Sequence, residues 1–114
     1  MMKQKKIIVF DMDETLGCFV QLGIFWDALQ EYFNNTLTDT DFFEILDKYP
    51  EFIRPKMLSI LKYLKKKKQK RHLSQVIIYT NNQGPKSWAY KIKNYFHYKL
   101  NYKLFDQVIC AYKI

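Results

Sequence analysis

Three short apolar runs, separated by longer amphipathic stretches, set the hydrophobic pattern of this chain. The runs are 7–10, 75–79 and 104–111, and each is rich in β-branched or aromatic residues. Continuous apolar runs of this length are typical of strands that are covered on both faces, as in parallel α/β sheets. We therefore expect three parallel strands, joined through helices by right-handed βαβ connections.

Apolar residues at helical spacing predict the helices between these strands: 24–33, 38–48, 55–64 and 85–96. The first two form a small helical insertion, in which Asn34 and Asn35 end one helix and the stretch Thr38-Asp39-Thr40-Asp41 caps the next. Pro55 and Pro85 each suit the first turn of a longer helix. The stretch 17–23, with a glycine at each end, is expected to be a short flap.

The length and composition favour one small intracellular domain. The chain has 114 residues and two cysteines that lack metal-ligand or redox spacing, which suits a reduced, cytoplasmic protein. Only four apolar residues follow the basic N-terminus, too few for a signal peptide, and no apolar stretch approaches the length of a membrane span.

The net charge of +8 is unevenly distributed. Residues 1–61 carry six Lys and Arg against ten Asp and Glu, and residues 62–114 carry thirteen against one. A basic half could bind nucleic acid or a phosphorylated protein. The basic run 65–72 has no interleaved aromatic residues, so a solvated helix end is favoured over a nucleic-acid patch.

Two carboxylates, Asp11 and Asp13, directly follow the first predicted strand, and Thr80 and Asn81 follow the second. Ligands of open α/β sheets bind beyond the carboxyl ends of the strands. Paired carboxylates at this place suit Mg²⁺ and a phosphoryl group. The alternative interpretation is an acidic turn without chemistry.

The segment 6–17, K-I-I-V-F-D-M-D-E-T-L-G, resembles motif I of the haloacid dehalogenase (HAD) superfamily. Its D-x-D-E-T-L form is closest to phosphatases that act on the C-terminal tail of RNA polymerase II. The resemblance implies that Asp11 is the nucleophile and becomes an aspartyl phosphate, and that Asp13 is the general acid and base. It also implies Mg²⁺ bound at Asp11 and Asp13, with the backbone carbonyl as the ligand from Asp13.

The end of the second strand is similar to motif II of the same superfamily, which implies that the Thr80 hydroxyl and the turn at Asn81 bind the phosphoryl group. T-N-N-Q-G resembles the T-N-Q-x-G turn of polynucleotide 3′-phosphatases and histidinol-phosphate phosphatases, and departs from the T-A-S form of the polymerase-tail enzymes. R-P-K at 54–56 is similar to an R-P-G opening in the latter, which suggests Arg54 as a phosphate contact. A surface arginine at a helix start is the equal alternative.

The motif III Lys and the motif IV Asp of the superfamily have no clear counterpart. No acidic residue follows Asp106, and Lys103 and Lys113 lie in no recognisable setting. We therefore expect a partial HAD-like, Rossmann-like sheet over 1–114 that lacks its C-terminal part and leaves one edge of the first strand bare, open to self-association. The expected function is a weakly active or incomplete Mg²⁺-dependent phosphatase of an unknown phosphorylated substrate. The alternative is a non-catalytic remnant or a phosphate- or nucleic-acid-binding module.

Overall fold

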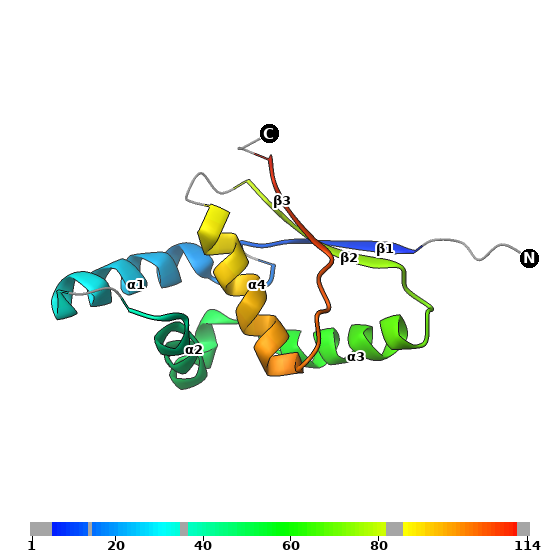
Figure 1. Cartoon of the computed structure of the whole chain (residues 1–114), viewed down its shortest axis with the longest axis horizontal. Coiled ribbons are helices and arrows are strands. Elements are labelled where there is room, and N and C mark those ends of the chain that lie inside the picture. The colour runs from blue at the N-terminus through cyan, green and yellow to red at the C-terminus, as the bar shows by residue number, and fades with distance from the viewer. Residues whose placement is uncertain (1–5, 14, 35–36, 82–85, 112–114) are drawn as a thin grey trace, which may run out of the picture.

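The computed structural model describes residues 6–13, 15–34, 37–81 and 86–111 of the chain. Within them, three parallel strands and four α-helices form an α/β fold, which confirms the predicted class (Figure 1). The elements, with one 3₁₀ turn (η1), are β1 (Ile7–Asp11), α1 (Phe19–Phe33), α2 (Asp39–Lys48), η1 (Pro50–Phe52), α3 (Met57–Gln69), β2 (Gln75–Thr80), α4 (Lys86–Leu100) and β3 (Gln107–Cys110).

The strand order in the sheet is β1-β2-β3, the same as the order along the chain. Ile7 of β1 lies beside Gln75 of β2, and Ile77 of β2 lies beside Gln107 of β3. Connections of one hand between strands in sequential order return on the same face of a sheet. Accordingly, α2, α3 and α4 lie on one side of the sheet in Figure 1, and α1 extends past the carboxyl end of β1.

The other face of the sheet is open along β1, and the prediction of strands covered on both faces was wrong for this strand. Ile7 and Val9 on this face are 52% and 56% exposed, whereas Ile77 of β2, beside Val9, is only 8% exposed. Tyr79, further along the same face beside Asp11, is 39% exposed. Ile8 and Phe10 alternate with the exposed residues of β1 and pack against the core on the helix side. Among the described strands β1 pairs only with β2, so its outer edge is bare, as predicted.

The predicted flap at 17–23 was also wrong, because α1 begins at Phe19. Phe19 and Leu22 are fully buried and extend the apolar stripe of the helix by a turn and a half beyond the predicted start. Gly17 is needed because Phe52 and Phe19 lie very close to its Cα, and not because the backbone bends there. A Cβ there would collide with the Phe52 carbonyl oxygen and lie 2.7 Å from the Phe19 ring.

The predicted caps of the helical insertion are confirmed. Asn34 is left-handed with φ 52° and closes α1 through its N–H to the Glu31 carbonyl. Thr38 and Asp41 form a reciprocal capping box at the start of α2. The hydrogen bonds from the backbone and side chain of Thr38 lower the pKa of Asp41.

The start of α3 differs from the prediction by two residues. Pro55 precedes the helix, Lys56 occupies the N-cap with a left-handed φ of 66°, and α3 begins at Met57. Met57, Leu61 and Leu64 then form the predicted buried stripe. Pro85, Asn35 and Lys113 lie outside the described residues.

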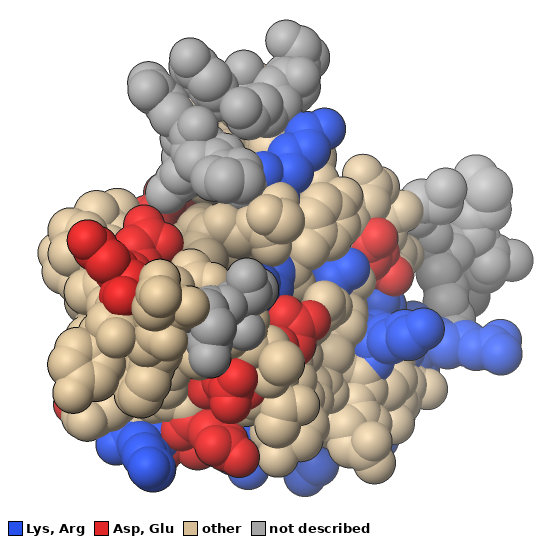
Figure 2. All heavy atoms as spheres, turned by 60° about the vertical axis from the view of Figure 1, so that its left-hand side comes forward, with Lys and Arg blue, Asp and Glu red and all other residues tan. Residues whose placement is uncertain are grey.

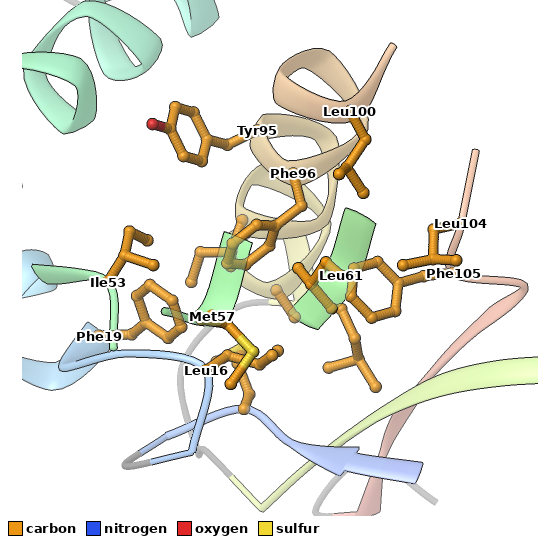
Figure 3. Packing of buried hydrophobic residues seen from close by; sticks show 14 of the residues in the cluster. Leu16, Phe19, Ile53, Met57, Leu61, Tyr95, Phe96, Leu100, Leu104 and Phe105 are labelled. Carbon is orange, nitrogen blue, oxygen red and sulfur yellow. The ribbon is translucent and has the colours of Figure 1, made fainter. Parts of the chain in front are cut away.

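The third strand is shorter than predicted, because Leu104 and Phe105 lie in the connection before it. Both side chains are buried against the end of α4 (Figure 3). Asp106 binds the start of β3 to β2 through two hydrogen bonds with Val76. Its N–H donates to the Val76 carbonyl at 2.8 Å, and its Oδ2 accepts from the Val76 N–H at 2.9 Å.

The basic run at the end of α3 is partly structural. Lys65 donates to the Leu100 carbonyl at the end of α4, and Lys68 donates to the Leu104 carbonyl and pairs with Asp106 at 2.6 Å. Lys65 thus satisfies a carbonyl oxygen that the last turn of α4 leaves unbonded, and Lys68 binds the connection between α4 and β3. No helix of the described segments is long and apolar enough to cross a membrane.

Candidate functional site at the carboxyl edge of the sheet

The carboxyl ends of β1 and β2 meet at one edge of the sheet, as the sequence predicts. Asp11 is the last residue of β1 and lies beside Tyr79 of β2. The N–H of Met12 donates to the Tyr79 carbonyl over 3.0 Å and extends the ladder by one residue. Asp11 and Thr80 therefore occupy neighbouring backbone positions.

The loop after β1 is held in place from both sides. Met12 and Leu16 are fully buried and anchor the loop in the core, and the Leu16 N–H donates to the Met12 carbonyl at 3.1 Å. The Leu16 carbonyl accepts the N–H of Arg54, and the Cys18 N–H donates to the Phe52 carbonyl. A loop with these bonds at both ends presents its carboxylates on a defined backbone.

The two carboxylates differ in exposure. Asp11 is exposed at the end of the strand, whereas Asp13 is half-buried and its Oδ1 atom is shielded from solvent. Asp13 also forms an isolated backbone bridge with Gly17, which is bridged in turn to Ile53. One carboxylate is thus accessible to a ligand from solvent, and the other belongs to the packed part of the loop.

Thr80 lies on the helix side of the sheet. It is 2% exposed, is the only polar residue among the buried described ones, and lies beside Cys110 in the register of β2 and β3. By strand alternation Asp11 belongs to the opposite, open face together with Tyr79. The structure thus joins Asp11 and Thr80 at one edge, but on alternate sides of the sheet; Asn81 follows them and is exposed.

Arg54 contacts the loop after β1 through its backbone and also lines a separate hollow. Its N–H donates to Leu16 in the loop. Arg54, Pro55, Lys56 and Tyr95 line a hollow of about 270 Å³ that does not include Asp11 or Thr80.

The donor set at this edge is compatible with Mg²⁺, although it is small. The described residues contain no group of three or more His, Cys, Asp or Glu side chains that could enclose a metal ion. Mg²⁺ is usually held by one or two carboxylates, substrate phosphate oxygens and water, so Asp11 with the backbone of Asp13 fits it.

The charged side chains around this end of the molecule are mixed in sign. Figure 2 brings the α1 side forward and shows acidic and basic side chains in several small groups between uncharged ones. Among the described residues, two ion pairs join α2 to α4, Asp39 with Lys91 and Asp47 with Lys99, and a third joins Asp106, before β3, to Lys68 of α3. Of the carboxylates of α2, Asp41 thus serves in the helix cap, and Asp39 and Asp47 form ion pairs with α4.

Sequence reasoning missed a hollow beside the site, between α1 and the start of α4. Its walls include Trp26 and Trp88, and its volume is about 400 Å³. The aromatic residues of 24–33 and Trp88 were the sequence signal for such a hollow. The hollow also depends on the early start of α1, which hydrophobic spacing alone did not predict.

Comparison with known proteins assigns the chain to no family. The chain matches no protein-family model, no curated protein and no solved structure. The function must therefore be argued from the residues themselves.

Proposed function

We propose that this chain carries the nucleophile and phosphate-binding part of a HAD-like, Mg²⁺-dependent phosphatase site, with slow turnover of phosphate monoesters. The observation that supports this most is the pair Asp11 and Thr80 at adjacent carboxyl ends of parallel strands. Ligands of open α/β sheets bind at this position. The loop that carries Asp13 supplies the second carboxylate required by a two-step mechanism.

In the first step, a carboxylate oxygen of Asp11 attacks phosphorus and the ester P–O bond breaks. Asp13, in its protonated form, gives its proton to the leaving oxygen. In the second step, water attacks the phosphorus of the acyl phosphate and loses a proton to the Asp13 carboxylate. The P–O bond to Asp11 then breaks, which releases inorganic phosphate and restores both residues.

The metal would be held by the Asp11 carboxylate and the backbone of Asp13. When bound, Mg²⁺ reduces the repulsion between the carboxylate and the phosphate ester. With one direct carboxylate in the described site, we expect a dissociation constant on the order of millimolar or weaker. Low millimolar Mg²⁺ should then shift the melting temperature very little.

Thr80, Asn81 and Arg54 are the proposed phosphate contacts. Asn81 is exposed where β2 ends, and the Arg54 N–H donates to the loop after β1, which supports both residues as contacts at this edge. Thr80 lies on the helix side of the sheet, on the face opposite to Asp11. We expect Thr80→Val to weaken turnover less than Asp11→Asn does.

The open sheet face and the bare edge of β1 provide a second surface. Ile7, Val9 and Tyr79 form an exposed apolar strip next to unpaired backbone groups of an edge strand. Exposed apolar edges of this kind template the addition of another strand. We propose self-association through β1 as the default behaviour of the isolated chain, measured as concentration-dependent mass by analytical ultracentrifugation. A monomer at all concentrations would contradict it.

Nucleic-acid binding is the weaker alternative. Lys65 and Lys68 donate to backbone carbonyls within the fold, so half of the four consecutive lysines at 65–68 are engaged. The other alternative is a non-catalytic phosphate-binding module, and the following assay distinguishes it from a phosphatase.

The test is hydrolysis of p-nitrophenyl phosphate with Mg²⁺, compared with chelator. The parent chain should release p-nitrophenol slowly, Asp11→Asn should remove this activity, and Glu44→Gln, an exposed carboxylate on α2, should not change it. Equal rates for the parent and Asp11→Asn would place the chemistry elsewhere. Phosphate binding without turnover would support the non-catalytic module.

A further inference from the structure

A hollow of about 400 Å³ lies beside the candidate site, bordered by α1 and the first turns of α4. In Figure 1 the start of α4 lies over the first turns of α1, next to the loop that follows β1. This volume is within the range of about 300 to 1,000 Å³ that is typical of small-molecule sites. The hollow therefore has the size to receive the organic part of a phosphate ester.

Two indole rings form its apolar walls. Trp26 is buried and Trp88 is half-buried, and both contact the ring of Phe42 edge to face, with centroid distances of 5.2 and 5.4 Å. Phe42 thus holds both indoles in fixed orientations. Of the two, the half-buried Trp88 can offer a flat aromatic surface to the hollow, which favours a planar ligand that can stack on it.

Gly23 keeps the hollow open between these walls. It lies inside α1, where glycine has no backbone role because its φ is not positive. A Cβ at this position would lie 3.6 Å from the Trp88 ring, in ordinary contact. A longer side chain from Gly23 would therefore occupy the space in front of Trp88.

The rim of the hollow carries hydrogen-bonding groups of both kinds. The Asp27 carboxylate accepts, the Gln30 amide donates and accepts, and the Ser87 hydroxyl does both. The ammonium of Lys91 is already held by Asp39 at 2.7 Å and lies over the Trp26 ring. With that cation engaged, the rim suits a neutral group with several polar edges better than a phosphate.

We propose that this hollow binds the base of a nucleotide whose phosphate lies at the carboxyl edge of the sheet. This assignment of substrate class rests on the proposed phosphatase function. A phenol ring would use one polar group of the rim, whereas a nucleobase has donors and acceptors for all three. Stacking on aromatic side chains is a general mode of base recognition.

The two tryptophans of the chain both line the hollow, so tryptophan fluorescence reports directly on its occupancy. The probes are adenosine and guanosine, which carry no phosphate, and the titrations need no metal. We expect saturable quenching with a dissociation constant on the order of millimolar. Gly23→Leu should weaken binding at least tenfold. The matched control Gln21→Leu, with the same new side chain on the exposed surface of α1, should leave it unchanged.

Quenching that is not saturable, or that is equal in Gly23→Leu and the parent, overturns the proposal. Saturable binding of tyrosine amide without binding of either nucleoside overturns it too, in favour of an aromatic side chain as the ligand. The Asp11→Asn variant should bind nucleosides like the parent. If Asp11→Asn loses turnover while neither the parent nor the variant binds nucleosides, the proposed phosphatase site stands and only the nucleotide as substrate class is overturned.

The link to hydrolysis is tested by a ratio of rates. Gly23→Leu should lower kcat/KM for nucleoside monophosphates at least tenfold more than for glycerol phosphate, which has no ring to place in the hollow. Equal losses for both substrates would overturn the assignment of the base to this hollow.

Discussion

The N–H of Phe105 donates a hydrogen bond of 3.0 Å to Nε2 of His97, and the two rings stack with planes 13° apart. The bond requires Nε2 to be unprotonated, so this histidine acts as an acceptor for the connection between α4 and β3. His97 was an isolated residue in the sequence, and the structure gives it a packing role.

The first prediction concerns pH. Burial, followed by the nearby Lys93, Lys103 and Lys68, lowers the pKa of His97 from 6.5 to about 4. The unfolded chain therefore binds more protons than the folded chain between these values, and the stabilisation present above pH 6.5 is lost as the pH falls toward 4. From about pH 7 to about pH 5, the free energy of unfolding should fall by about 2 kcal/mol through this residue.

The measurement is urea unfolding at both pH values, with His97→Gln as the comparison. The variant should be less stable at neutral pH but should lose less stability on acidification. An equal acid loss in parent and variant would show that other groups carry the pH dependence.

The second prediction concerns the two glycines at 17 and 23. Gly17→Ala should reduce the free energy of unfolding by about 1 to 3 kcal/mol, because its methyl group meets the backbone at Phe52. Gly23→Ala is the matched control: its methyl group finds ordinary contact and it improves helix propensity, so it should be neutral or stabilising. Thermal unfolding of the two variants should give opposite signs, and equal destabilisation would contradict the close approach at Gly17.

The third prediction concerns Lys56, a non-glycine residue with φ 66° at the start of α3. Lys56→Gly should raise the free energy of unfolding by about 1 kcal/mol, since glycine adopts this conformation without a steric cost. Lys56→Ala keeps the Cβ and should give no such gain. If the alanine and glycine variants melt alike, the left-handed conformation is not what limits stability there.

The fourth prediction compares two lysines of the same basic run. Lys68→Met should cost about 1 to 3 kcal/mol, because it leaves the Leu104 carbonyl and the Asp106 carboxylate without their shared donor. Lys66→Met, at an exposed position of α3, should cost less than about 0.5 kcal/mol. Denaturant unfolding measures the loss of stability in both variants, and similar midpoints would show that Lys68 is only a surface charge.

Much of the fold could be predicted from hydrophobic spacing and caps. Asn34 and Thr38 ended and began helices as expected, because their side chains and backbone preferences act locally. The exposure of Ile7 and Val9 could not be predicted from the strand alone. It depends on both crossovers returning on the same face, which is a property of the whole sheet.

The candidate site was predictable in position but not in orientation. Asp11 and Thr80 each end a strand, and parallel strands bring their carboxyl ends together. Which face Thr80 occupies depends on the register of β2 against β1 and β3, which the sequence does not encode locally. The roles of Asp106 and His97 depend on partners about 30 and 8 residues away, in contacts made only on folding.

The most direct test of the phosphoaspartyl proposal is mass spectrometry of the chain after acid quench of a reaction with p-nitrophenyl phosphate and Mg²⁺. The p-nitrophenolate group leaves without a proton, so Asp13→Asn can still form the adduct but lacks the base that activates water. We predict a phosphoryl group on Asp11 that accumulates in Asp13→Asn and is absent from Asp11→Asn. An Asp13→Asn chain without phosphoryl on Asp11, or a phosphoryl group on another residue that persists in Asp11→Asn, would contradict the account.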